Sequence, residues 1–464
     1  MKDQCARWER GTAIGLCAVV LGLLVIFAWR YADERLYADS GYYLFRVVNE
    51  SSFHIEHGRW VLALAQALPL VGVKLGLPMG AVIHLHSLAN VVFLMLSMIY
   101  ALVLLKDRRT ALLLAMAQVI GLAHGLFCPV FELYYGVALV LLFHATAAND
   151  RLEGRTRMAI SLVLFVGALS SHPMAWPLLL GSVVLLDHRQ RRPLFLTLIV
   201  ITAAFAIVRG LTMSTYESAQ LGFMQRLAFP SLVLDLFTPG TMLAQLRREL
   251  QHYPDVLALA VFTATVLWRS ERRRNAVVFV GGLLGLYIAI GLYMPDATHD
   301  RYREQVDFAL AAWTLLVMFA GAWRLAQWRP ALLILLVLCT VFRVVYASSI
   351  TPYYEARTQW HRDLIAQAHE RGLSKAIISS PTIAFGTVED RVAPYWSTGV
   401  ETLLLSAKDG PEEAVSVITT DDAQCPGVPE NLDKLVLRCW DMLEPASLDQ
   451  RYFRLRRARY ERLQ

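Results

Sequence analysis

Long apolar runs recur along this 464-residue chain and constrain its fold more than any other feature. A helix needs about 20 apolar residues to cross the roughly 30 Å hydrocarbon core of a bilayer. Hydrophobic residues make up 56% of the sequence and charged residues only 18%, a balance more apolar than that of soluble domains. We therefore predict an α-helical polytopic membrane protein. Candidate spans cover residues 11–29, 80–105, 110–127, 130–147, 193–209, 255–268, 275–294, 306–323 and 330–346.

Two further apolar segments are not simple spans. Residues 158–186 contain "SSHPMAWP" at 170–177, which predicts two short helices that meet at a break. Together with the candidate spans above, these two short helices bring the expected number of spans to about eleven. Residues 60–78 carry Lys74 and two prolines, so we expect this segment to lie along the outer surface or to re-enter the membrane without crossing it.

Basic clusters determine the predicted topology, because Lys and Arg accumulate at the cytoplasmic ends of spans. The first span is not followed by a small-residue cleavage site, which indicates an uncleaved anchor. We place the amino terminus and all the basic clusters inside. The outer parts are then the first loop 30–58, the loop 210–254, the short loop 295–305 and everything after 348. The clusters lie at 106–109, 151–157, 187–192, 269–274 and 323–329.

The last part of the chain differs in character from the rest. We divide the chain into a transmembrane domain, 1–349, and a small extracytoplasmic α/β domain, 350–464, with strands expected at 375–380, 415–420 and near 451–457. Cys425 and Cys439 both lie in this tail, where an outside location would permit them to pair. The net charge of +6 comes from the cytoplasmic loops, so no nucleic-acid partner is expected.

The first outer loop contains an unusual carboxylate in the segment "LYADSGYYLF", residues 36–45. Asp39 lies among three tyrosines, and the segment to Val48 is typical of an amphipathic helix at the membrane interface. A carboxylate in such a place can accept a proton from a substrate hydroxyl, so Asp39 is a candidate general base. The same loop also carries Glu56, His57 and Arg59, for which simple solvation is the alternative interpretation.

Two further ionisable residues lie close to predicted spans. Glu132 is near the outer beginning of a span, where an ionisable group usually faces a cavity or a partner. His172 lies at the break in "SSHPMAWP" and would point toward the same cavity. The alternatives are a solvated Glu132 and a capping or packing role for His172.

The short outer loop "PDATHDRYREQ", residues 295–305, concentrates charge beside a span. Outward arginines oppose the positive-inside tendency, and two arginines at the level of the lipid head groups favour phosphate binding. A solvated turn is the alternative. The candidate binding residues here are His299, Arg301, Tyr302 and Arg303.

The order of these motifs resembles the GT-C superfamily of membrane glycosyltransferases, especially the lipid A aminoarabinose transferase and protein O-mannosyltransferase families. "YADSGYYLF" occupies the place of the acidic motif of the family, and "IEHGRW" that of its second element. "FELYYG", "SSHPMAWP" and "HDRYREQVDFALAAW" follow in the same order as the later elements of the family. The resemblance covers roughly the first 325 residues.

The resemblance implies an inverting transferase that uses a polyprenyl-phosphate sugar at the outer face of a bacterial inner membrane. Asp39 would deprotonate an acceptor hydroxyl, while Arg59, Arg301 and Arg303 stabilise the departing phosphate. Glu132 and His172 would orient the sugar or the acceptor, and a divalent metal at Glu56 and His57 is possible but not certain. The acceptor would be a lipid, a polysaccharide or a protein, and membrane lipids would surround the chain.

Other functions fit parts of the pattern. A transporter or flippase of lipid-linked sugars would explain many spans and polar outer loops, although neither internal halves nor charges at mid-membrane are clear in the sequence. An oligosaccharide polymerase or ligase would use a large late outer loop, for which 210–254 is a candidate. A structural role with the tail as a docking module is a third alternative.

Overall fold

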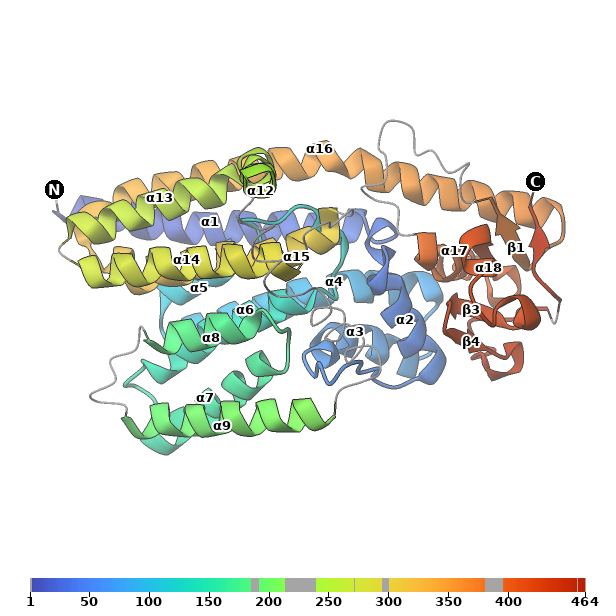
Figure 1. Ribbon diagram of the computed structural model, residues 1–464, viewed down its shortest axis with the longest axis horizontal. Coiled ribbons are helices and arrows are strands. Elements are labelled where there is room, and N and C mark those ends of the chain that lie inside the picture. Colours follow the sequence, from blue (N-terminus) through green and yellow to red (C-terminus); the bar gives the residue numbers. More distant parts are fainter. Residues whose placement is uncertain are drawn as a thin grey trace.

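The computed structural model describes residues 2–184, 192–212, 239–270, 272–293, 300–379, 395–456 and 458–463. These residues are mostly helical with a small sheet, as predicted. Figure 1 shows a bundle of long helices, with the carboxyl-terminal part of the chain at one end of the bundle. His299 lies outside the described residues, as does most of the predicted loop 210–254.

The helices of the bundle and of the first loop succeed one another along the chain, and their positions match most of the apolar runs. They are α1 (Lys2–Arg30), α2 (Asp39–Glu50), α3 (Leu62–Lys74), α4 (Met79–Ile99), α5 (Arg108–Met116), α6 (Glu132–Ala147), α7 (Gly154–Leu169), α8 (Ala175–Val184), α9 (Arg192–Leu211), α12 (Pro239–His252), α13 (Pro254–Arg269), α14 (Arg273–Tyr293), α15 (Asp300–Ala320) and α16 (Arg329–Glu370).

Within the described ranges, five helices are long and apolar enough to cross a membrane. They are Trp8–Arg30, Met79–Leu104, Arg273–Gly291, Arg303–Arg324 and Ala326–Glu370. The predicted count of about eleven spans and the predicted sidedness therefore stay predictions. The 13-residue α3 is too short to cross by itself, in line with the expectation for residues 60–78.

The continuous helix predicted for 110–127 is wrong. Helix α5 ends at Met116, and the chain turns before a short 3₁₀ helix, His124–Phe127. Gly121 has φ +76°, a conformation that favours glycine. The following N–H groups of Ala123, His124 and Gly125 donate to the Glu304 carboxylate of α15 at 2.6–3.1 Å. This irregular backbone is tolerated inside the bundle because a buried side chain satisfies its donors.

The tail is attached through α16, a 42-residue helix that runs without interruption across the predicted domain boundary at 349–350. Figure 1 shows α16 extending from the bundle along the tail. The sheet has the order β2-β1-β5, with both pairs parallel. Its strands are β1 (Lys375–Ile378), β2 (Ser416–Thr419) and β5 (Glu461–Arg462), accompanied by α17 (Thr398–Ser406), α18 (Thr420–Ala423) and the antiparallel hairpin of β3 (Leu435–Arg438) and β4 (Asp441–Leu443).

The strand expected near 451–457 is wrong, since residues 451–456 contain none. The aromatic side chains of Tyr452 and Phe453 are buried, and the Phe453 ring lies 5.4 Å from that of Phe45 in α2. This segment therefore packs the tail against the first loop. The apolar residues that suggested a strand are explained by that contact.

The expectation that α2 rests on the membrane interface is also corrected. Tyr42 and Tyr43 are 2% and 4% exposed, because α3 and α17 cover the helix, and Tyr37, just before it, is 1% exposed and packs on Tyr354 of α16. Figure 1 shows α2 between the bundle and the tail. The tyrosines therefore pack inside the protein, and Asp39 begins a helix held at a junction of protein segments.

The predicted topology is testable with reporters. A periplasmic reporter enzyme fused after residue 464 should be active, whereas the same enzyme inserted next to Arg272, between α13 and α14, should be inactive. A cytoplasmic reporter should give the reverse pattern at both sites. If the tail is active with the cytoplasmic reporter, residues 60–78 cross the membrane and the proposed arrangement is incorrect.

Candidate active site

A cavity of about 340 Å³ lies where the first loop, the bundle and the tail meet. It contains three carboxylates, two arginines, two histidines and two tryptophans, a composition that binds polar ligands with both charges. The lining residues are Asp39, Tyr43, Glu56, His57, Arg59, Glu132, His172, Gln305, Val306, Trp396, Arg438, Cys439 and Trp440.

A buried arginine anchors the first loop on α4. Arg35 is fully buried and donates to the carbonyl oxygen of Ser87 at 3.0 Å and to Asn90 Oδ1 at 2.7 Å. The hydroxyl of Ser40 lies 2.8 Å from His86 Nε2, on the same helix. These contacts hold both flanks of Asp39 and fix where α2 begins.

The residue before Asp39 has an unusual backbone conformation. Ala38 has φ +54° and ψ −122°, which non-glycine residues rarely adopt. Its N–H donates to Glu401 Oε1 of the tail helix α17 at 2.9 Å. Arg357 of α16 donates to both oxygens of the same carboxylate, and Glu401 is only 2% exposed. The tail thus stabilises the backbone that positions Asp39.

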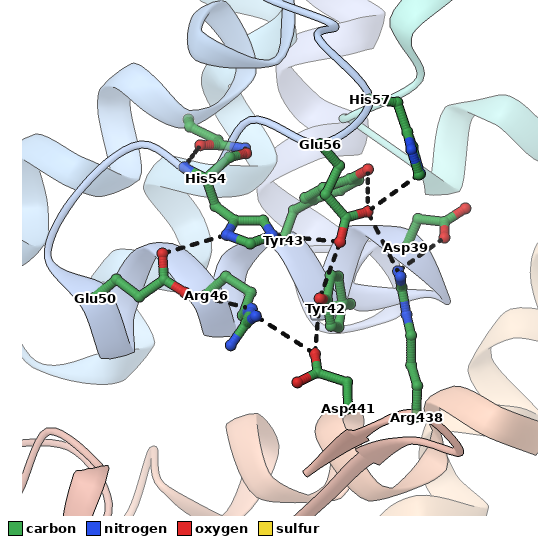
Figure 2. Close-up of polar contacts among 11 residues, drawn as sticks. Asp39, Tyr42, Tyr43, Arg46, Glu50, His54, Glu56, His57, Arg438 and Asp441 are labelled. Atoms are coloured by element: carbon green, nitrogen blue, oxygen red, sulfur yellow. Dashed lines mark hydrogen bonds and ion pairs between the residues drawn. The ribbon is translucent and has the colours of Figure 1, made fainter. Parts of the chain in front are cut away.

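Glu56 is the centre of the polar network drawn in Figure 2. The hydroxyls of Tyr42 and Tyr43 lie 3.0 and 3.1 Å from its two oxygens, and His54 Nε2 lies 3.3 Å away. Arg438 of the tail approaches Glu56 at 3.5 Å and Asp39 at 3.7 Å. One guanidinium therefore lies between the two carboxylates.

The network determines the protonation of Glu56. Burial by itself would raise the pKa of this carboxyl, but the His54 hydrogen bond, the charge of Arg438 and the Tyr42 hydroxyl lower that pKa to about 2. Burial would likewise lower the pKa of Arg438, yet the nearby Glu56 and Asp39 carboxylates raise it. Both groups are charged at neutral pH, so Glu56 is a fixed anion that holds Arg438 in place and is unsuited to accept a proton.

The lowered pKa of Glu56 should make the stability of the protein depend on pH. Because its folded pKa lies below the ordinary value of 4.5, its stabilisation is present above about pH 4.5 and is lost as the pH falls toward 2. The size is on the order of 3 kcal/mol. Thermal unfolding in detergent between pH 5 and 3 should show a smaller loss of stability for Glu56→Gln than for the wild type. Glu412→Gln, at an exposed pair with Arg454, should behave like the wild type, and an unchanged slope in Glu56→Gln would contradict the assignment.

The second half of the loop presents Arg59. His57 and Gly58 have φ +52° and +60°, so the chain reverses sharply here. The positive φ of Gly58 favours glycine, and a Cβ there would also displace the end of the Arg209 side chain of α9, whose Nη1 would lie 2.8 Å away. Arg59 Nη1 donates to Glu132 Oε1 at 2.7 Å, and the other oxygen of Glu132 accepts from Gln305 at 3.1 Å.

The tip of the β3–β4 hairpin closes the cavity from the tail side. Arg438 ends β3, and Cys439 and Trp440 form the turn. Cys439 is bonded to Cys425, which fastens the turn to the segment after α18. The Arg438 guanidinium stacks on Tyr42, 3.5 Å from the ring centroid, and lies 5.0 Å from the centroid of Trp396. Trp440 is 72% exposed and offers an open aromatic surface at the rim.

Six predicted site residues line this one cavity, although they come from four separate stretches of sequence. They are Asp39, Glu56, His57, Arg59, Glu132 and His172. His172 is buried at the break between α7 and α8, where its Nδ1 accepts from the N–H of Met174 at 3.1 Å.

Of the two arginines expected to bind phosphate, Arg303 does not line the cavity. Arg303 is buried and its Nε donates to Asp307, one turn further along α15, at 3.1 Å; it is not among the lining residues. Gln305 and Val306 of the same helix line the cavity instead. Arg301 and Tyr302 lie in the first turn of α15, and their side chains are outside the described structure.

The site residues that sequence reasoning missed come from the tail. Trp396, Arg438 and Trp440 line the cavity, and Glu401 supports it. The "RCW" stretch at 438–440 carried a signal, since a charged residue and a tryptophan flank a cysteine with a possible partner in the tail. Nothing in the sequence linked it to a loop nearly 400 residues earlier.

The possible metal site has little support from the geometry. Glu56 and His57 lie 3.8 Å apart, but the Glu56 oxygens already contact Arg438, His54 and two tyrosine hydroxyls. Across the described ranges, no group of three or more His, Cys, Asp or Glu side chains is arranged to hold a metal ion. The divalent metal that the resemblance implies stays a prediction, and the mechanism proposed below does not use it.

Comparison with known proteins adds no further constraint: no protein family, curated protein or solved structure matches this chain.

Proposed function

We propose that this chain is an inverting glycosyltransferase that moves a sugar from a polyprenyl-phosphate donor to an envelope acceptor at the outer face of a bacterial inner membrane. The observation that carries the proposal is the single cavity in which Asp39, Arg59 and Arg438 converge. A proton acceptor and two phosphate-binding cations are the groups that such a transfer needs.

Asp39 is the proposed general base. Its side chain is 26% exposed, against 19% for Glu56 and 6% for Glu132, so it is the most accessible of the three carboxylates to a substrate hydroxyl. Glu56 and Glu132 are held by several donors and serve as structural anions. The acceptor O–H proton passes to Asp39 as the acceptor oxygen attacks the anomeric carbon.

The departing group is the lipid phosphate. The bond between the anomeric carbon and the phosphate oxygen breaks on the face opposite the attack, which inverts the configuration, and the electron pair stays on the phosphate. Arg59 and Arg438 line the cavity and neutralise the developing charge; removing such a contact from a water-excluded site costs several kcal/mol of transition-state stabilisation. Both arginines are already oriented by carboxylates, Glu132 and Glu56 respectively.

The remaining lining residues fit a sugar. Trp396 and Trp440 present aromatic rings, against which the apolar face of a pyranose packs, and His172 and Gln305 offer hydrogen-bonding groups. The disulfide Cys425–Cys439 supports the outer location, because disulfides persist mainly in oxidising compartments.

Mass spectrometry of envelope glycans, lipids and glycoproteins with and without this chain tests the proposal. We expect one class of acceptor to lose a single sugar increment and to regain it with the wild-type gene. Loss of whole oligosaccharides would favour a polymerase or ligase. Simultaneous loss of a sugar from several unrelated acceptors would favour a flippase.

A further inference from the structure

A second cavity, of about 370 Å³, lies between α1 and α16, away from the candidate active site. Both helices are long and apolar enough to cross a membrane. The walls are apolar, contributed by α1, by α16 and by the segment after α5, whereas charged and hydroxyl side chains gather at one end. The lining residues are Val20, Leu23, Leu24, Ile26, Phe27, Arg30, Tyr31, Val119, Leu122, Leu126, Thr340, Arg343, Val344, Ala347, Ser348, Thr351, Pro352 and Glu355.

This second cavity is a groove whose length is that of one bilayer leaflet. Glu9 of α1 and Arg329 of α16 lie 3.7 Å apart at the starts of both helices, so the two helices run in parallel. From Val20 to Tyr31 the groove follows α1 for about 16 Å at roughly 1.5 Å per residue. This equals about half of the roughly 30 Å hydrocarbon core. Leu23 and Ile26 are exposed, so the groove is open to the side from which a bilayer lipid would enter.

The polar end of the groove carries both charges. Arg30 and Glu355 line it, are exposed, and form no ion pair with a described residue. Pro352 has no N–H, so it cannot donate to the carbonyl of Ser348 one turn earlier, and that acceptor also lies at this end. An arginine, a carboxylate and a carbonyl at one end of the groove match a head group that has a phosphate and an ammonium.

A buried donor lies deeper in the groove. Arg343 is 1% exposed and pairs with Asp255 of α13, but its Nη1 has no hydrogen-bond partner among the described residues. An unsatisfied buried guanidinium N–H is costly. Because Nη1 itself is inaccessible to solvent, a lipid oxygen cannot reach it, and Arg343 forms part of the wall of the groove.

Aromatic packing separates this groove from the candidate active site. Phe27 of the groove contacts Phe127, whose ring stacks on Tyr354 at 3.6 Å, and Tyr37 makes an edge contact with Tyr354. We propose that the groove binds a zwitterionic phospholipid of the phosphatidylethanolamine type, with its phosphate at Arg30 and its ammonium at Glu355. This lipid is distinct from the proposed sugar donor.

Native mass spectrometry of the purified full-length chain tests the proposal without a transfer assay. The probes are diacyl phosphatidylethanolamine, its dialkyl ether analogue, diacyl phosphatidylglycerol and a polyprenyl phosphate. We expect one saturable site that binds both phosphatidylethanolamines, with binding at least about fivefold weaker for phosphatidylglycerol and polyprenyl phosphate, as a lost ion pair of about 1 kcal/mol gives.

Surface variants provide matched comparisons. Arg30→Ala should weaken phosphatidylethanolamine binding about tenfold, the effect of losing a charge-assisted contact of about 1.4 kcal/mol. Glu355→Gln should abolish the preference over phosphatidylglycerol. Arg10→Ala and Glu370→Gln, elsewhere on the same two helices, should leave binding unchanged. The absence of a saturable phosphatidylethanolamine site, equal or tighter binding of phosphatidylglycerol or polyprenyl phosphate, or equal effects of the control variants would overturn the proposal.

Discussion

Replacing Asp39 by Asn should lower the rate of sugar transfer by roughly three orders of magnitude, within the range that general bases contribute. Asn has nearly the same shape but cannot take the proton from the acceptor hydroxyl. The side chain is partly exposed and its Arg438 partner keeps Glu56, so the variant should remain folded. The measurement is the transfer rate per folded molecule, with thermal unfolding recorded on the same preparation.

Asp33→Asn is the matched control for this variant. Asp33 lies in the same loop, six residues earlier, but its carboxylate contacts Lys408 and Arg362 at 2.8 Å, outside the cavity lining. Its replacement should leave transfer within about twofold, since such partly exposed pairs contribute little. Near-wild-type transfer by Asp39→Asn would remove the base from the mechanism.

Replacing Arg357 by Ala should cost about 3–5 kcal/mol of stability, because it leaves a buried carboxylate without its cation. Arg357 and Glu401 are 3% and 2% exposed, and the Glu401 carboxylate also accepts the N–H of Ala38. The loss should appear as a lower unfolding temperature in detergent. Because the pair joins α16 to α17, the tail should also become more sensitive to limited proteolysis.

Arg362→Ala, one turn further along α16, is the appropriate comparison. Its side chain is 47% exposed and pairs with Asp33 at the surface, so its loss should cost no more than about 1 kcal/mol. A second variant, Glu401→Gln, keeps an acceptor for Ala38 while removing the charge. Similar stability for the two arginine variants would show that Arg357 does not hold the tail in place.

The first loop could be predicted from sequence because its signal is local. Asp39 is a lone carboxylate among tyrosines, and Glu56, His57 and Arg59 follow within one short segment. The break at His172 was equally visible, since Pro173 and Pro177 follow it closely. Periodicity and helix breakers act over a few residues, so they locate such elements without any tertiary information.

The environment of α2 could not be predicted in the same way. Buried tyrosines and interfacial tyrosines have the same sequence pattern, and only the packing of α3 and α17 distinguishes them. Likewise, Arg303 resembled a phosphate ligand until Asp307 was placed beside it, although an i, i+4 spacing already allowed that pair. The role of Arg438 depends on a contact across almost the whole chain, which a single sequence does not encode locally.

In the proposed mechanism, the cavity shared by the first loop and the tail transfers sugar from a polyprenyl phosphate. The most direct measurement is the acceptor-dependent release of free polyprenyl phosphate by the purified chain reconstituted with envelope lipid extract, followed by liquid chromatography and mass spectrometry. We predict release by the wild type and almost none by Asp39→Asn or Arg438→Ala. Release that is equal in all three proteins, or no release by a folded wild type supplied with extracts that contain donor and acceptor, would contradict the claim.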